Sequence, residues 1–373
     1  MHVSQLNLQN FRSYESLELK FNPGINVLVG TNGQGKTNVV EALAYLASFS
    51  SHRVASDVPL IKQNSDQATV KVEVDDQGRK VSLEIELNPS KANRAKLNGS
   101  AVPKTRDILG VLLTVIFAPE DLSLVKSDPS ERRKFLDETL TMLTPSFVGV
   151  RSDYERILRQ RNALLKSAYG ANRDEVRSTL DVWDGQIARI GAEIVFERIQ
   201  LVNRLAPIVE ADYTTVSLDR GPFKIVYKSS IDLEPDSSVN DIEMAILNQL
   251  AERRKDELDR GVTLVGPHRD ELELELRGLP VRGYASHGES WSCALALKMA
   301  VFHLLREVSR HGDPVLILDD VFAELDEVRR EQLLKLINEC EQTFVTAAVA
   351  SDIPAGLNGT MFKVADGVVV RYE

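Results

Sequence analysis

The chain has 373 residues, 43% of them hydrophobic and 27% charged, which is typical of a compact globular protein and excludes a disordered or fibrous one. This length favours two or three domains over a single core. The formal net charge is −10, so the chain as a whole repels nucleic acid, and any contact with DNA must use a local basic surface.

Predicted strands dominate the first 118 residues. Apolar runs between turn residues indicate strands at 3–8, 25–29, 69–74, 81–87 and 112–117. One helix interrupts them, from Lys36 to about Ser48, directly after a glycine-rich turn. Long helical patterns then take over at 130–143, 145–167 and 173–209, with a strand-like piece at 223–227.

The strand pattern resumes after Gly261. Strands are predicted at 264–265, 272–276, 315–318, 344–349, 361–364 and 368–372, and helices at 288–310 and 327–338. Two strand-bearing ends flank a helical middle that lacks a sustained heptad array. The sequence therefore predicts an α/β head domain assembled from residues 1–118 and 261–373, with a mostly helical arm inserted at 119–260.

Cysteine usage and hydropathy bear on the compartment. The two cysteines, Cys293 and Cys340, lie in separate apolar runs without the paired spacing of a zinc site or a disulfide framework. The N-terminus has no basic stretch followed by an apolar one, and nowhere do about 18 apolar residues follow one another. We expect a cytoplasmic protein that neither is exported nor spans a membrane.

The most specific motif follows the predicted strand at 25–29 and opens a helix. It matches the P-loop pattern G-x-x-x-x-G-K-[ST] in full, with the residues Gly30, Thr31, Asn32, Gly33, Gln34, Gly35, Lys36 and Thr37. In such a loop the backbone N–H groups wrap the phosphates, Lys36 reaches the β and γ phosphates, and the Thr37 hydroxyl binds Mg²⁺. The sequence therefore predicts an ATP site.

A second motif supplies the acidic strand that a P-loop requires. Four apolar residues at 315–318 end in Asp319 and Asp320. Asp319 is predicted to hold Mg²⁺, and Asp320 to orient or deprotonate the attacking water. Without the P-loop, a buried strand ending in an acidic turn would be the simpler interpretation.

A third segment has two interpretations. The turn Ser286-His287-Gly288 opens a predicted helix, so it can be an anion-binding helix N-terminus or an ordinary N-cap that binds nothing. His268 is also better explained as a satisfied structural residue than as a catalytic one.

The order and spacing of these motifs resemble the RecF family within the SMC superfamily, whose members are ABC-type ATPase heads. The resemblance covers essentially the whole chain. It rests on the motifs at 8–14, which include Arg12, at 30–37, 117–122, 132–137 and 266–270, on the Ser286 segment, and on the run from Asp319 to Asp326.

The resemblance implies a dimeric ATPase with composite sites. Arg12 would join the P-loop in binding ATP, Ser286 and Gly288 would contact the γ-phosphate bound by the other subunit, and Asp326 would lie at the dimer interface. Two departures stand out. In the signature segment, which begins at Ser286, Glu289 replaces the glutamine usual in such ATPases. No histidine follows the strand at 344–349, and its absence suggests slow ATP hydrolysis, coupled to opening of the dimer.

The resemblance also implies partners. These are duplex DNA and its junctions with single-stranded gaps, a second copy of the chain in the presence of ATP, RecR with RecO, and indirectly RecA. On the helix predicted at 145–167, the side chains of one face are basic and those of the other apolar; the basic ones are Arg151, Arg156, Arg159 and Lys166. This face can be a DNA surface, or a solvated face balanced by Asp153 and Glu155.

Two other functions remain open at this point. A P-loop kinase acting on a small molecule would need an acceptor pocket and a lid. The cytoplasmic ATPase subunit of a transporter has a shorter helical insertion than this chain and carries the histidine missing here. The ABC-like order of the Ser286 and Asp319 segments favours the ATP-dependent DNA repair protein.

Overall fold

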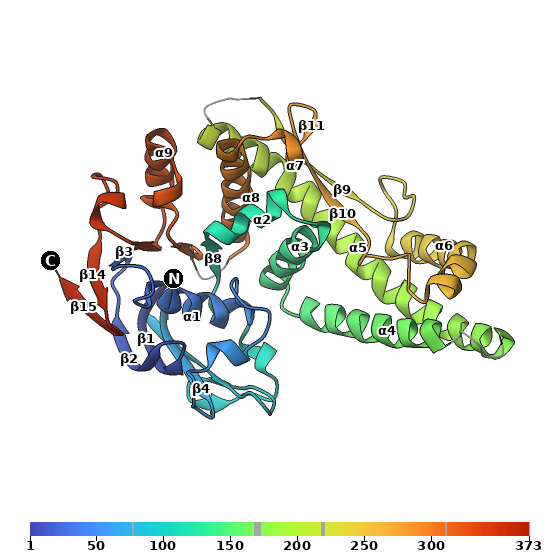
Figure 1. Ribbon diagram of the computed structural model, residues 1–373, viewed down its shortest axis with the longest axis horizontal. Coiled ribbons are helices and arrows are strands. Elements are labelled where there is room, and N and C mark those ends of the chain that lie inside the picture. Colours follow the sequence, from blue (N-terminus) through green and yellow to red (C-terminus); the bar gives the residue numbers. More distant parts are fainter. Residues whose placement is uncertain (77, 168–172, 218–220, 310–311, 373) are drawn as a thin grey trace.

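The computed structural model describes residues 1–373 except 77, 168–172, 218–220, 310–311 and 373. Figure 1 shows two lobes, one rich in sheets and formed by both ends of the chain, and one mostly helical and formed by the middle. In this described part, none of the helices is long and apolar enough to cross a membrane.

The first sheet is antiparallel and entirely N-terminal. Its strands lie in the order β2-β1-β4-β5-β6-β7. Alternate side chains of β1 and β4 are buried, which is typical of a sheet with one face on the core. The bounds are β1 (His2–Phe11), β2 (Tyr14–Lys20), β4 (Ala68–Asp76), β5 (Arg79–Leu87), β6 (Arg94–Leu97) and β7 (Ser100–Ala101).

The second sheet combines strands from both ends of the chain in the order β15-β14-β3-β13-β12-β8. All neighbours are parallel except β14 and β15. The N-terminal β3 pairs along its whole length with the C-terminal β13, which confirms the predicted head assembled from both termini. The bounds are β3 (Gly24–Val29), β8 (Thr114–Phe117), β12 (Val315–Leu318), β13 (Gln342–Ala347), β14 (Thr360–Ala365) and β15 (Val368–Tyr372).

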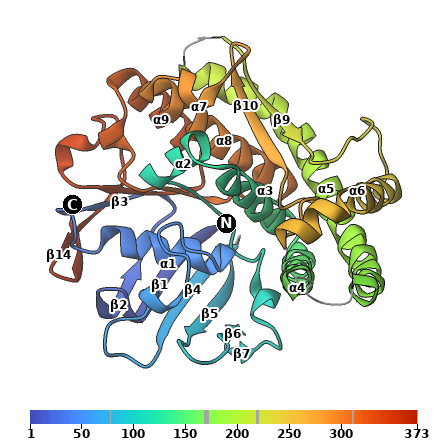
Figure 2. The ribbon, with the colours of Figure 1, turned by 45° about the vertical axis from the view of Figure 1, so that its right-hand side comes forward.

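Helix α1 (Lys36–Ser48) packs between the two sheets, as Figure 2 shows. The parallel sheet is covered on both faces, so its central strand β12 is apolar at every position. Val315 and Ile317 belong to the core shared with α1 and the antiparallel sheet, whereas Leu316 and Leu318 belong to the core shared with the helical lobe. The continuous apolar run therefore reflects two cores.

The helical lobe is organised around the long helix α5 (Arg173–Ser217), which packs against α4, α6, α8 and β9. A small antiparallel sheet of β9 (Phe223–Lys228), β10 (Glu271–Leu276) and β11 (Leu279–Pro280) lies on it. The other helices are α2 (Leu122–Lys126), α3 (Pro129–Leu143), α4 (Phe147–Ser167), α6 (Val239–Arg260), α7 (Val281–Tyr284), α8 (His287–Val308) and α9 (Glu327–Ile337), and the short 3₁₀ turns are Val58–Leu60, Thr105–Ile108, Pro119–Asp121, Phe322–Glu324 and Ala350–Asp352.

Buried arginines fasten the segments of this lobe together. Arg198 on α5 makes two hydrogen bonds with Asp137 on α3, at 2.8 and 2.9 Å, and a third with the Pro267 carbonyl. Arg161 on α4 is fully buried and pairs with Asp184 at 2.7 Å and with Glu257 at 2.6 Å. Removing one partner from such a buried pair is expected to destabilise the protein strongly.

Several predicted elements need correction. Residues 264–265 form no strand, because two apolar residues do not define a pleat; they belong to the turn after α6. Helix α5 continues through Pro207 to Ser217 instead of ending at 209, since its packing outweighs the helix-breaking proline. Strand β2 was missed although its burial alternates. The predicted end of the helix at 310 lies outside the described residues, and the boundaries at 118 and 260 stay predictions.

Candidate functional site

The site lies where parallel strands of the second sheet end. Strands β3, β13, β12 and β8 run in the same direction, so their carboxyl ends meet at one edge of the sheet. The segments that follow β3 and β12 are the P-loop and Asp319, although they are far apart in the sequence. In open α/β sheets this edge is where ligands bind.

Glycines give the P-loop its shape. Gly33 and Gly35 have φ angles of 85° and 108°, in the left-handed region that other residues avoid. A Cβ atom on Gly30 would lie 2.2 Å from the Val364 carbonyl oxygen, so the loop can cross β14 only with glycine there. Gln34 accepts a hydrogen bond from the backbone N–H of Asp366, which ties the loop to the β14–β15 turn.

The loop ends at the N-terminus of α1, which has no side-chain cap and no acidic residue in its first turn. Its backbone N–H groups and dipole are therefore available to an anion. Lys36 is 3% exposed, and within the described part of the chain its Nζ makes two long hydrogen bonds of 3.5 Å, with the Thr31 carbonyl and the Asn32 amide oxygen. A buried ammonium held this loosely is well suited to phosphate.

Asp319 connects the acidic strand to the P-loop. Its Oδ1 accepts hydrogen bonds from the hydroxyls of Thr37 at 3.1 Å and Thr346 at 2.6 Å. The Thr37 hydroxyl and the Asp319 carboxylate are hard oxygen ligands on one side of the phosphate loop, which is the donor chemistry that Mg²⁺ takes with nucleotides. These residues therefore fit a magnesium ion bound with nucleotide phosphates.

Asp320 is half-buried and has a different environment. Its φ of 52° turns it away from the direction of β12, and its N–H donates to the Thr346 hydroxyl at 2.9 Å. Burial raises the pKa of the Asp320 carboxyl, the Lys36 charge opposes that shift, and neighbouring Asp319 adds to it. Such a carboxyl is a candidate to accept a proton.

Arg12 lies beside the site but is already engaged. It makes two hydrogen bonds with the fully buried carboxylate of Glu41, at 2.8 and 2.6 Å, and one with the Pro59 carbonyl at 3.0 Å. Because a guanidinium has five N–H donors, two remain for a ligand. The Arg12–Glu41 pair thus fixes the guanidinium against α1.

The Ser286 segment is satisfied within itself. Ser286 caps α8: its hydroxyl accepts from the Glu289 N–H at 3.3 Å, and the Glu289 carboxylate accepts from the Ser286 N–H at 2.8 Å. Arg277 donates to the same carboxylate at 2.6 Å. The Ser286 N–H and Arg277 lower the pKa of Glu289 to about 2. The departure at Glu289 therefore completes a capping box.

Asp326 and Gly288 lie together, but away from the P-loop. Asp326 caps α9 and pairs with Arg329, whose guanidinium donates to Ser292 on α8 at 2.8 Å. A Cβ on Gly288 would lie 3.2 Å from that guanidinium. Among the described residues, no hydrogen bond or ion pair joins Ser286, Gly288 or Asp326 to the P-loop. In Figure 1, α7 lies above α2 and α3, and α8 lies between α9 and α5, so α7 is separated from β3 and α1.

Three neighbours of the site belong to no motif in the sequence: Thr346, Glu41 and His52. Thr346 stands on β13, which gave no polar signal because the whole strand is buried. Glu41 was detectable, since a lone carboxylate in the apolar helix α1 must find a partner. The Nε2 of His52 lies 3.7 Å from Asp319 Oδ2, and nothing in the sequence around His52 indicated this contact.

The other predicted side chains behave as follows. Arg156, Arg159 and Lys166 are exposed on α4, but Arg156 pairs with Asp153 at 3.0 Å, and Arg151 with Glu155 at 3.6 Å. The basic face is thus partly balanced by the acidic residues of the same helix. His268 Nε2 donates to the Thr263 carbonyl at 3.2 Å, so Nδ1 of the neutral ring accepts from the Tyr154 hydroxyl at 2.7 Å. Burial lowers the pKa of His268 to about 4, as expected of a structural residue.

Known proteins match this chain over its whole length. The model of the RecF/RecN/SMC N terminal domain family matches residues 2–361. A DNA replication and repair protein RecF from Streptomyces avermitilis is 51% identical over 375 residues, and one from Kineococcus radiotolerans is 50% identical over 391 residues; each match covers 100% of both chains.

Solved structures agree with this match. A recombination mediator protein RecF of the RecFOR pathway, in a form with ATP, is 29% identical with a TM-score of 0.87, and the match covers 100% of this chain and 99% of that one. An Smc head bound to the C-winged helix domain of ScpA is 18% identical with a TM-score of 0.58, covers 100% of this chain and 98% of that one, and shows the fold alone.

Proposed function

Because the chain belongs to the RecF family of DNA replication and repair proteins, we propose that it is an ATP-dependent recombination mediator that dimerises on DNA. One observation carries this proposal. The phosphate-binding half of the site is assembled within one chain, whereas the N-terminus of the signature helix α8 is capped by its own residues and makes no hydrogen bond or ion pair with the P-loop among the described residues. Such a division suits a site that is completed by a second subunit.

ATP binding by the P-loop follows from its geometry. The uncapped N-terminus of α1 offers backbone N–H groups to the phosphates, and Lys36 offers a buried charge whose hydrogen bonds to the described residues are long, at 3.5 Å. The relative solved with ATP supports the choice of nucleotide. Arg12, fixed by Glu41, would direct its two remaining N–H donors at the phosphate groups.

Slow hydrolysis is the second part of the proposal. Magnesium bound by Thr37 and Asp319 would neutralise the charge that develops on the phosphates. Asp320 would orient the attacking water and accept its proton, because burial already raises the pKa of this carboxyl. Apart from this proton transfer, the chain would contribute positioning and charge stabilisation.

Dimerisation completes the site. Ser286 and Gly288 of one subunit would cover the γ-phosphate held by the P-loop of the other, with Asp326 at the interface. ATP thereby joins the two subunits, and hydrolysis opens them. The closed dimer would hold duplex DNA next to single-stranded gaps and, with RecR and RecO, help to load RecA, in the cytoplasm at the nucleoid.

The DNA surface is the least specified part of the proposal. Arg159 and Lys166 are exposed on α4, and no ion pair holds either within the described chain. We assign them to DNA phosphates ahead of Arg151 and Arg156, which are paired. A local patch of this kind is needed because the net charge of −10 repels DNA.

The two alternatives are less well supported. A small-molecule kinase needs an acceptor pocket next to the phosphate loop and no second signature segment. A transporter subunit would be expected to match a different family from the one that spans residues 2–361 here.

The test is the size of the protein in solution with and without ATP and duplex DNA, at several salt concentrations. We expect a monomer alone, a dimer with ATP, and a DNA complex that weakens steeply as salt rises, because phosphate contacts release counterions. Asp320→Asn should bind ATP yet hydrolyse it more slowly, so its dimer should accumulate. A protein that stays monomeric with ATP and for which Asp320→Asn changes nothing would overturn the proposal.

A further inference from the structure

The imidazole of His52 is buried without a hydrogen-bond partner. Both ring nitrogens are inaccessible to solvent and unpaired, although the side chain as a whole is 12% exposed. A buried polar group left unpaired costs about 1–3 kcal/mol, so native proteins rarely keep one without a function. His52 lies near the proposed catalytic centre, which makes a role there the first possibility to consider.

The backbone around His52 is held firmly, in contrast to its ring. The Ser51 hydroxyl donates to the buried Glu41 at 2.6 Å and accepts the backbone N–H of Arg53 at 3.0 Å. Arg53 reaches the Asn38 amide oxygen at 3.2 Å. The loop after α1 is therefore anchored on both sides of His52, and only the imidazole is unsatisfied.

The ring faces the Oδ2 atom of Asp319, which accepts no hydrogen bond from the described residues. Thr37 and Thr346 donate to Oδ1, whereas His52 Nε2 is 3.7 Å from Oδ2. This distance exceeds a hydrogen bond by about 0.5 Å. A small rotation of either side chain would close it.

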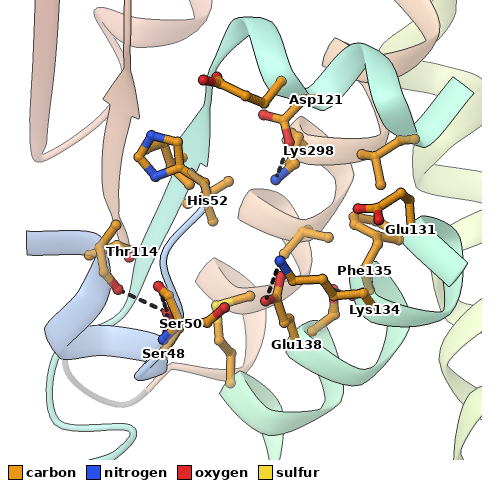
Figure 3. Close-up of a pocket in the computed structure, with 18 of the residues that line it drawn as sticks. Ser48, Ser50, His52, Thr114, Asp121, Glu131, Lys134, Phe135, Glu138 and Lys298 are labelled. Carbon is orange, nitrogen blue, oxygen red and sulfur yellow. Dashed lines mark hydrogen bonds and ion pairs between the residues drawn. The ribbon is translucent and has the colours of Figure 1, made fainter. Parts of the chain in front are cut away.

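A cavity next to His52 gives the ring room to move. It has a volume of about 110 Å³, enough for several water molecules but too small for a nucleotide. Figure 3 shows His52 on one side of it and the ion pairs Lys298–Asp121 and Lys134–Glu138 on the other, with N–O distances of 2.9 and 3.8 Å. Glu120 and Glu131 also line the cavity, but among the described residues the carboxylate within ion-pair distance of the ring is Asp319, with 3.7 Å between His52 Nε2 and Oδ2.

We propose that His52 is a positioning residue that donates a hydrogen bond from Nε2 to Asp319 Oδ2 when magnesium and nucleotide bind. This inference rests on the proposed function, because it assigns the partner that orients the metal-holding carboxylate. Carboxylates that bind metals are commonly oriented by such outer partners, and their removal typically costs 10–100-fold in metal affinity or activity. The 3.7 Å between Nε2 and Oδ2 is too long for a hydrogen bond without ligand and would shorten in the complex, as active-site contacts often do.

The experiment measures metal affinity in the presence of a non-hydrolysable ATP analogue, with Mn²⁺ as a spectroscopically visible substitute for Mg²⁺. His52→Ala should weaken Mn²⁺ binding about 10–100-fold and raise the Mg²⁺ concentration needed for half-maximal ATPase by a similar factor. Binding of the analogue in the presence of a chelator should not change. A structural role would instead lower thermal stability without moving the metal affinity.

Two further variants test the hydrogen bond itself. The amide nitrogen of His52→Gln takes the place of Nε2 and should recover most of the affinity, whereas that of His52→Asn takes the place of Nδ1 and should not. Thr139→Ala is the matched control, because Thr139 lines the same cavity but its hydroxyl donates only to the Phe135 carbonyl at 2.8 Å. It should bind Mn²⁺ like the unmodified protein.

The outcomes separate this inference from the proposed function. If the unmodified protein bound no metal and nucleotide together, the proposed function itself would fail. If it bound both and His52→Ala matched it, only the role of His52 would be rejected. Equal losses in Thr139→Ala, or in the Gln and Asn variants alike, would also reject it, since the cavity and not the hydrogen bond would then matter.

Discussion

The N-termini of α1 and α8 both follow turns of small residues, but α1 has no side-chain cap and α8 has one. Helix α1 begins after Gly35 with no side-chain cap and no acidic residue. Helix α8 begins after Ser286 with a complete capping box and an acidic residue, Glu289, in its first turn. The first terminus leaves its N–H groups to a ligand, whereas the second needs no ligand to be stable.

This difference indicates how the work is divided between subunits. The α1 terminus has within its own chain a lysine, a threonine hydroxyl and an aspartate that suit bound phosphate and metal. The α8 terminus has its own cap, with the Arg277, Arg329 and Lys126 side chains around it. A terminus that is stable in isolation can be presented to a second molecule without rearrangement, which reduces the cost of association.

The largest effect should come from Lys36→Met, which removes the cation from the α1 terminus. Loss of one partner from a buried, hydrogen-bonded charge pair costs about 2–5 kcal/mol, so ATP affinity should fall roughly 30-fold or more, and ATP-induced dimerisation with it. Nucleotide titration and sizing would measure both. Thermal stability without ATP should hardly change, because the hydrogen bonds of Lys36 to the described residues are long, at 3.5 Å. Normal dimerisation of this variant with ATP would contradict the assignment.

Ser286→Arg should distinguish the role of the α8 terminus from that of the α1 terminus. The monomer should bind ATP as before, since every P-loop contact lies within one chain, but dimerisation and hydrolysis should be lost. If Ser286 were only an N-cap, as a kinase would need, the change would cost about 1 kcal/mol of stability and leave assembly intact. Ser286→Ala is the control for the loss of the cap alone.

Mixing Ser286→Arg with Lys36→Met extends this test. A heterodimer of the two contains one site in which an intact P-loop faces an intact signature segment. ATPase activity should partly return on mixing and be absent from each variant alone. No recovery, with folded variants and demonstrated heterodimers, would argue strongly against a site shared between subunits.

Much of the fold could be predicted because local patterns and tertiary structure agree. The apolar run of β12 reflects burial on two faces, and the glycines of the P-loop reflect left-handed backbone and close packing on β14. The prediction of a strand at 264–265 was wrong because short apolar pairs carry no period. The continuation of α5 through Pro207 depends on packing that no local signal reveals.

The site was less predictable, because it depends on contacts between distant segments. The P-loop pattern identified Lys36 and Thr37, and the parallel strands then bring Thr37 within 3.1 Å of Asp319. The position of His52 depends on how the loop after α1 folds back. Glu289 differs from these: the pattern Ser286-x-x-Glu289 is a capping box in the sequence itself, but it was interpreted as a departure from the signature.

The smallest effect should come from Glu289→Gln, which changes the charge of the α8 cap and keeps its shape. The amide oxygen of glutamine can still accept from the Ser286 N–H, as in other capping boxes. The ion pair with Arg277 is lost, and such pairs near the surface contribute about 0–1 kcal/mol. At neutral pH the variant should therefore be less stable by under about 1 kcal/mol, with unchanged ATP binding by the monomer.

The pH dependence of that difference tests its origin. Folding lowers the pKa of Glu289 from 4.5 to about 2, so its charge stabilises the folded chain above pH 4.5, and this contribution is lost as the pH falls towards 2. Urea unfolding of both proteins at a series of pH values should show that the difference between their free energies of unfolding becomes smaller as the pH falls from 4.5 towards 2. If this difference in free energy of unfolding stayed constant with pH, the lower stability of Glu289→Gln would come from packing. If the difference grew as the pH fell, the Glu289 carboxylate would not be stabilised by Arg277 and the α8 terminus.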